Sequence, residues 1–132
     1  MGRLSPILRS LAGGLVAFWC PGCHTSHALG VVGIWAWGYN GNPDAPTFTP
    51  SVKITGIDFT PEGLALLEKD RIDGTRRDDG FTYPHVVTCC HSFVTDGQIK
   101  FLGDCTHALA NQTVPIPPWP DAADASKERK DA

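Results

Sequence analysis

The chain has 132 residues, of which 42% are hydrophobic, and this length suits one domain with a modest core rather than two. Its formal net charge of −3 argues against non-specific nucleic-acid binding, which normally requires a basic surface. Its 14 glycines and 11 prolines argue against a helix bundle and favour short strands with many turns, so we predict a mainly β fold, or an α+β fold with one short helix.

The first 19 residues faintly resemble a secretory signal, because Arg3 and Arg9 accompany an apolar stretch. Pro6 and Gly13-Gly14 interrupt that stretch, and Phe18-Trp19 stands where small residues normally precede a cleavage site. No apolar run reaches the ~18–20 residues needed to cross a bilayer. We therefore expect a cytoplasmic protein that is neither secreted nor membrane-bound.

Two strand regions are predicted in the N-terminal third. Leu15–Trp19 is a β-prone run that leads directly into a cysteine, and Ala28–Tyr39 is the second region. Within it three aromatic side chains alternate and would point to one face of a strand: Trp35, Trp37 and Tyr39. We interpret this row as core. The alternative is a stacking face for nucleic-acid bases, which the lack of nearby lysine and arginine disfavours.

A strand followed by one short helix is predicted in the middle of the chain. Val52–Phe59 can form a strand, and the prolines before it keep the preceding segment extended. Thr60-Pro61 has the signature of a helix start, with threonine as N-cap and proline in the first turn. Leu64 and Leu67 then recur at helical spacing, and Gly74 can end the helix.

A hairpin is predicted around Asp96-Gly97, with Val86–Val94 as its first strand and Gln98–Asp104 as its second. A two-residue turn fixes the register and places Val94 opposite Ile99. Further along the chain, the composition becomes proline-rich and then small and charged. We expect 1–120 to form a single zinc-binding, β-rich domain and 121–132 to be a disordered tail.

The five cysteines favour a metal site, because an odd number fits a disulfide scaffold poorly. In "FWCPGCHTSH" the Pro-Gly turn aims the two sulfurs of Cys-x-x-Cys at one point. The hairpin register places Cys90 and Cys105 on one face as diagonal neighbours and turns Cys89 to the other face. Together these pairs predict a closed structural zinc site with four thiolate ligands: Cys20, Cys23, Cys90 and Cys105.

Other interpretations of this cluster stay open. His27, which has room to loop back, or His91, which adjoins a cysteine, could replace one of the thiolates as a ligand. A redox disulfide between Cys20 and Cys23 is a further alternative, and so is a set of buried, inert thiols.

The opposite face of the predicted hairpin carries His91 and Asp104 as diagonal neighbours, with His107 just beyond. Two histidines and a carboxylate could hold a catalytic metal with an open coordination position, as in a zinc-dependent hydrolase. His91 and Asp104 could equally form a pair for proton transfer. The plainer alternative is that both histidines are polar residues beside the zinc.

Three segments carry a family resemblance: "FWCPGCHTSH", "WGYNGNPDAPTFTPSV" and "CHSFVTDGQIKFLGDCTHALANQTVPIPPW". They resemble a family of small, functionally uncharacterised proteins of tailed bacteriophages and prophages, sometimes labelled "ammonia monooxygenase". The resemblance spans most of Phe18–Trp119 and implies a phage origin and a zinc site. The chain departs from the family pattern at His24, where glycine is common, and at Asn111, where the family often has glycine. Asparagine also tolerates a left-handed backbone.

These observations lead to three hypotheses of function. The first is a phage-encoded accessory or interaction protein with a structural zinc site, acting in the host cytoplasm on an unidentified protein partner. The second is a zinc-dependent hydrolase that uses His91, Asp104 and His107. The third is a nucleic-acid-binding module that uses the aromatic row. We prefer the first, non-enzymatic hypothesis, because four thiolates leave no position for a catalytic water.

Overall fold

Two antiparallel sheets and one helix make up the fold in the computed structural model, which describes residues 1–121. The predicted tail lies outside the described residues, apart from its first residue. The first sheet has the order β1 (Gly2–Arg3), β2 (Leu8–Leu11), β3 (Leu15–Cys20) and β4 (Thr25–Gly30). The second has the order β5 (Gly38–Tyr39), β6 (Phe48–Phe59), β7 (His85–Thr95), β8 (Gln98–Phe101) and β9 (Thr113–Pro115). The prediction of a mainly β fold with one short helix is confirmed.

The hydrophobic core lies between the two sheets. The first sheet contributes Leu8 and Phe18, and the second contributes Phe48, Val94 and Phe101, all of them at most 1% exposed. The rings of Phe18 and Phe48 stack at 6.3 Å between centroids and so join the sheets directly. Burial of these side chains is the main source of stability in a body of this size.

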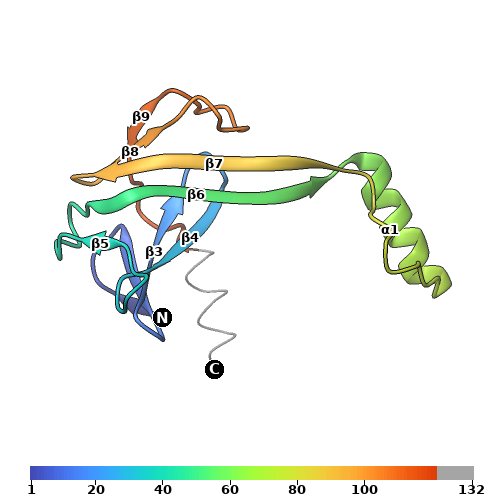
Figure 1. Cartoon of the computed structure of the whole chain (residues 1–132), viewed down its shortest axis with the longest axis horizontal. Helices are drawn as coiled ribbons and strands as arrows, with labels where there is room; N and C mark the ends of the chain where they lie inside the picture. Colours follow the sequence, from blue (N-terminus) through green and yellow to red (C-terminus); the bar gives the residue numbers. More distant parts are fainter. Residues whose placement is uncertain (122–132) are drawn as a thin grey trace.

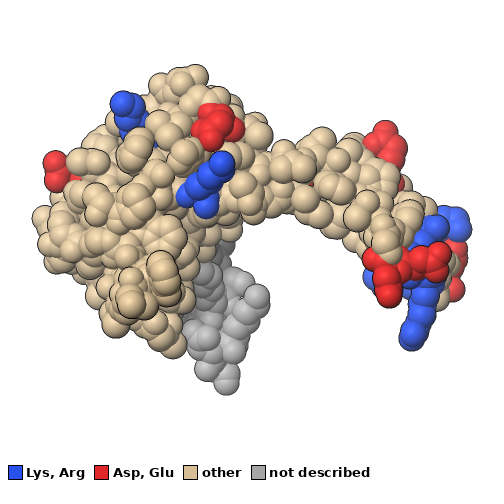
Figure 2. All heavy atoms as spheres, in the orientation of Figure 1, with Lys and Arg blue, Asp and Glu red and all other residues tan. Residues whose placement is uncertain are grey.

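A long arm projects from the two-sheet body (Figure 1). It consists of the outer halves of β6 and β7, paired from Val52↔Ser92 to Phe59↔His85, and it ends in α1 (Pro61–Asp73). Figure 2 shows acidic and basic side chains gathered around the α1 end of the arm. No helix within residues 1–121 is long and apolar enough to cross a membrane.

Helix α1 begins and ends as predicted. The Thr60 hydroxyl accepts a hydrogen bond from the Gly63 amide, and Gly74 ends the helix in the left-handed conformation with φ 70°. Leu64 and Ile72 remain 54% and 70% exposed, because the helix lies away from the body and has no sheet to cover its apolar side chains. The apolar spacing therefore identified a helix without a buried face.

The Ala28–Tyr39 region does not form one strand. Strand β4 ends at Gly30, and Gly33, with φ 109°, lies in the loop that separates it from β5. Trp35 lies in that loop and is 91% exposed, whereas Trp37 and Tyr39 are half-buried and pack against the core. The predicted common face of the three aromatic side chains is therefore wrong, because the turn interrupts the alternation on which it depended.

The hairpin between β7 and β8 has the predicted register near its turn, with Val94 opposite Ile99. The predicted continuation to Asp104 is wrong, because β8 ends at Phe101. A turn follows, and it brings the Thr106 amide, rather than the Asp104 amide that the predicted register places there, to the Cys89 carbonyl at 2.9 Å. This break changes which side chains meet next to β7.

Candidate functional site

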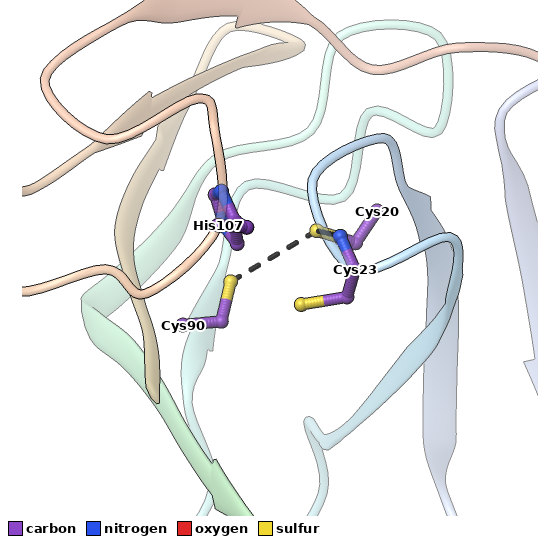
Figure 3. Close-up of side chains that lie close together, drawn as sticks. All are labelled: Cys20, Cys23, Cys90 and His107. Atoms are coloured by element: carbon purple, nitrogen blue, oxygen red, sulfur yellow. Dashed lines mark hydrogen bonds between the residues drawn. The ribbon is translucent and has the colours of Figure 1, made fainter. Parts of the chain in front are cut away.

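A cluster of four metal-binding side chains lies between the sheets. The ligand atoms of Cys20, Cys23, Cys90 and His107 all lie within 4.8 Å of one another (Figure 3). Cys20 ends β3, Cys23 lies in the turn that follows, Cys90 lies in β7 and His107 lies in the loop after β8. Three thiols and an imidazole are a ligand set typical of structural zinc sites.

The turn after β3 presents its two cysteines to one point. The Cys23 amide donates a hydrogen bond to the Cys20 sulfur at 3.4 Å, and the His24 amide donates to the Cys20 carbonyl at 2.9 Å. His24 has φ 56°, so it occupies the left-handed conformation that glycine adopts most easily. The predicted Cys-x-x-Cys turn is therefore present, with a backbone N–H group directed at a sulfur.

The sulfur atoms are close enough to share a cation. The Cys20 and Cys90 sulfurs lie 3.9 Å apart, and both side chains are at most 3% exposed. A tetrahedral site with Zn–S bonds of about 2.3 Å would place neighbouring sulfurs about 3.8 Å apart. The contact with Cys90 lowers the pKa of Cys20, whereas contact with Cys20 raises the pKa of Cys90 and burial raises that of Cys23. A charged Cys20 thiolate thus opposes ionisation of Cys90 and Cys23, and a bound cation would relieve that conflict.

His107 completes the cluster. Its Nε2 atom is buried without a hydrogen-bond partner, and its ring packs edge-on against Phe101 at 4.6 Å between centroids. Such an orphaned atom beside three thiols fits a metal ligand. The Leu109 amide donates to His107 Nδ1 at 3.2 Å, so metal binding at Nε2 requires the ring proton to move to Nδ1 and this contact to open.

Gly22→Ala is expected to weaken metal binding by about 10-fold or more, as for changes that disturb ligand orientation. A methyl group at Gly22 would lie 2.4–2.6 Å from three atoms of the His107 ring, so the imidazole would have to leave its place. Competition with a chromophoric chelator measures the affinity. Gly80→Ala is the matched control, because its methyl group would meet no atom within 4 Å. Equal affinities would show that His107 is not a ligand.

Cys105 lies outside the cluster, although it was predicted as the fourth thiolate. Its sulfur accepts a hydrogen bond from the His91 amide and donates one to the His91 carbonyl, both at 3.2 Å. The turn after Phe101 causes this difference, because it moves Cys105 onto the His91 backbone and brings His107 to the metal-binding side chains. Cys105 therefore fixes the backbone position of His91.

The other sequence candidates lie around the cluster or on the opposite face of the sheet. His27, a possible substitute ligand, is buried edge-on against Phe18 and is not one of the four clustered residues. Cys89 points to the opposite face, as predicted, where its sulfur lies 4.0 Å from Asp104. His91 also lies there, so the structure does not bring together the predicted trio of His91, Asp104 and His107.

A second constellation occupies that opposite face. His91 Nδ1 lies 3.0 Å from Asp104 Oδ2, and His91 Nε2 lies 3.0 Å from Ser51 Oγ. A carboxylate only accepts hydrogen bonds, so Nδ1 carries the proton and Nε2 presents a lone pair to the serine hydroxyl. Ser51 therefore donates to His91, and the three side chains form a chain of hydrogen bonds across β6, β7 and the loop after β8.

The surroundings hold these three residues in place while leaving them open to solvent. The Trp37 indole donates a hydrogen bond to the Ser51 carbonyl at 3.3 Å, and Cys105 bonds the His91 backbone. The side chains of His91 and Asp104 are 22% and 47% exposed. The hydrogen bond from His91 lowers the pKa of Asp104, which keeps this carboxylate charged beside the imidazole.

Ser51 is the site residue that the sequence interpretation missed. The register places Lys53 directly opposite His91, and Ser51, two residues earlier on β6, reaches the same face, as its 3.0 Å contact with His91 shows. The available signal was the serine in "PTFTPSV", a segment already singled out, together with the His91–Asp104 pair. Connecting them required the pairing of β6 with β7.

The geometry is that of a Ser–His–Asp triad, in which the histidine contacts both other residues at hydrogen-bonding distance. The chain belongs to the family described as "Bacterial ubiquitination-like system serine protease (BubE)", whose model matches residues 5–102, or 98 of the 132 residues. The matched range includes Ser51 and His91 and ends shortly before Asp104 and His107. No curated protein and no solved structure matched the chain.

Proposed function

We propose that the protein is a serine protease in which Ser51 is the nucleophile, His91 the general base and Asp104 the residue that orients His91. The observation that carries this proposal is the pair of 3.0 Å contacts that His91 makes with Ser51 and Asp104. Membership of a family described as serine proteases of a bacterial ubiquitination-like system supports a protein substrate.

The proposed reaction follows from the proton positions. Ser51 Oγ attacks the carbonyl carbon of the scissile peptide bond while its proton passes to His91 Nε2. The tetrahedral intermediate collapses, the C–N bond breaks, and the leaving amine takes the proton from His91. Water then attacks the acyl-serine ester with His91 again as base, which releases the acid and restores Ser51.

The proposed role of the metal is structural, and zinc is the metal that the ligand set favours. Four protein ligands would close the coordination sphere, so no position remains for a catalytic water. The cluster and the triad also lie on opposite faces of the same strand, since Cys90 and His91 are sequential residues of β7. This arrangement argues against the zinc-dependent hydrolase hypothesis, which required His107 beside His91.

The phage setting and the accessory role rest on the sequence resemblance alone. The matching family is described as bacterial, and this description does not support a phage origin. A structural zinc site is the part of that first hypothesis that the proposal keeps.

An alkyl fluorophosphonate tests the proposed activity without knowledge of the substrate. Attack by an activated serine forms an O–P bond and expels fluoride, so intact-mass measurement should show one phosphonyl group per chain. Peptide mapping should place that group on Ser51. His91→Ala should slow this labelling by at least about 10²-fold, because the general base is lost.

Labelling that is absent, or that is distributed over other serines, would contradict the proposal. Hydrolysis that persists after complete phosphonylation of Ser51 would also do so. Ser92, the residue after His91, is 2% exposed and lies opposite Phe101. It serves as an internal control that should remain unmodified.

A further inference from the structure

The edge of β6 beside Ser51 has no strand partner within residues 1–121. Strand β5 pairs only with the start of β6, through Gly38↔Thr49 and Tyr39↔Phe48. From Val52 to Phe59, β6 pairs within the described residues only with β7, which lies on its other side. Figure 1 shows this stretch of β6 running along the margin of the arm.

The hydrogen bonds of β6 and β7 show which backbone groups of β6 point outward at this edge. The Ser51 carbonyl is directed to it, because it accepts from the Trp37 indole instead of from β7. Across the pair, both backbone groups of Cys89 are bonded to Thr106. The His91 carbonyl accepts from the Leu102 amide and the His91 amide donates to the Cys105 sulfur, so these groups also point away from β6. Lys53↔His91 and Thr55↔Cys89 are therefore non-hydrogen-bonded pairs, so β6 turns alternate N–H and C=O groups outward. The residues that present them are Lys53, Thr55 and Ile57.

The triad is oriented toward the same edge. Its members lie across the sheet in the order Asp104, His91 and Ser51, because the loop after β8, β7 and β6 are successive neighbours. Ser51 is thus the member nearest the unpaired margin. A substrate carbonyl must reach Ser51 Oγ from a side that His91 does not occupy, and the β6 edge is on that side.

We propose that the edge of β6 from Lys53 to Ile57 binds the polypeptide segment that precedes the scissile bond, as an added antiparallel strand. This inference rests on the proposed protease function and specifies how its substrate is held. Main-chain hydrogen bonds supply affinity in this mode of recognition, while alternate side chains supply specificity. Antiparallel addition matches the rest of the sheet and is the more common pairing.

The direction of the added strand follows from the same geometry. An antiparallel strand runs from Ile57 toward Ser51 and so delivers its C-terminal end to the nucleophile. Beyond Ser51 the edge is occupied by the Trp37 indole and then by β5, so the added strand must end there. On the inner face of the arm, a pocket of about 490 Å³ extends from Gly56 and Asp58 to the metal-binding side chains, because Cys23, Cys90 and His107 also line it. The part of this pocket beside Gly56 and Asp58 provides space for alternate substrate side chains.

Two pools of peptide probes test this proposal. Each pool consists of tetrapeptides with randomised side chains that end in a phosphonate, and in the second pool every peptide nitrogen is methylated. We expect the first pool to label Ser51 at least about 10-fold faster than the second, since methylation removes the hydrogen-bond donors that an added strand needs.

Thr55→Pro provides the matching change in the protein. Proline removes the outward N–H of Thr55 without breaking the pairing with β7, and edge strands tolerate it. We expect this variant to lose the difference between the pools while a small alkyl fluorophosphonate labels it at the wild-type rate. Thr55→Ala, which keeps the N–H group, should retain the difference.

Three results would overturn the proposal. Equal labelling by the two pools would exclude recognition of the peptide backbone, provided that the alkyl probe still labels Ser51. If the alkyl probe fails as well, the proposed protease function itself fails. Light scattering that shows a dimer of the wild type and a monomer of Thr55→Pro would assign this edge to a second copy of the chain.

Discussion

Ser51→Ala is expected to abolish phosphonylation and to lower peptide hydrolysis by about 10⁶-fold, the size of effect seen when a triad nucleophile is removed. The alcohol is the only group in the triad that can form the acyl intermediate, because His91 and Asp104 transfer and orient its proton. The rate is measured by single-turnover cleavage of a substrate found by mass spectrometry in a peptide library. Metal content and thermal unfolding should remain at wild-type values, since the hydrogen bond to His91 is the one that the Ser51 hydroxyl makes within residues 1–121.

Asp104→Asn offers a second measurement of the same geometry. The amide could donate to His91 Nδ1 and so favour the wrong tautomer, which costs about 10⁴-fold in a triad enzyme of known mechanism. Because the triad acts as a unit, the double variant that combines Ser51→Ala with Asp104→Asn should hydrolyse peptides hardly more slowly than Ser51→Ala alone. Hydrolysis that survives both changes but disappears on chelation would instead place the reaction at the metal cluster.

Local signals predicted most of the secondary structure. The N-cap of Thr60, the left-handed Gly74 and the Asp96-Gly97 turn each depend on neighbouring residues, and all three lie where they were expected. Turn and capping preferences are properties of a few adjacent backbone groups, so they can be seen in the sequence. The break after Phe101 was missed although the sequence carries a signal for it, since the prediction extended the strand by three residues through Gly103 and Asp104, two residue types that strands disfavour.

The candidate site depended on contacts between distant residues. Ser51 meets His91 across 40 positions, and α1 lies between the two strands that carry them. A helix and loops between the strands leave the pairing register unspecified, and a slip of one residue would turn Ser51 to the other face. The cluster contains His107 instead of the predicted Cys105 for a related reason. The turn after Phe101 decides which side chain faces Cys90.

The positions of metal ligands and triad residues alternate along the same two segments. Cys90 precedes His91 on β7, and Asp104 precedes His107 in the loop after β8. Adjacent residues of a strand point to opposite faces, so one backbone supports both sites. The metal would thus fix the backbone that positions the triad, although it would lie on the opposite face of β7 from the triad.

Cys90→Ala is therefore expected to abolish zinc binding and, with it, the proposed protease activity, while every triad residue remains in the sequence. Loss of one ligand from a closed site removes folding free energy directly, because the metal binds only the folded arrangement. We expect thermal unfolding at a temperature lower by roughly 10 °C or more. Elemental analysis under reducing conditions, fluorophosphonate labelling and a thermal melt measure the three effects on one preparation.

Cys89→Ala is the matched control, because its sulfur points away from the cluster and lies 4.0 Å from Asp104. It should keep one zinc per chain and most of the labelling rate. A wild-type chain without zinc, or a Cys90→Ala chain that keeps zinc and activity, would show that the cluster is not a metal site. Loss of zinc in Cys90→Ala with full labelling of Ser51 would be the more informative failure, since it would show that the core alone holds β7 and that the metal has no part in positioning His91.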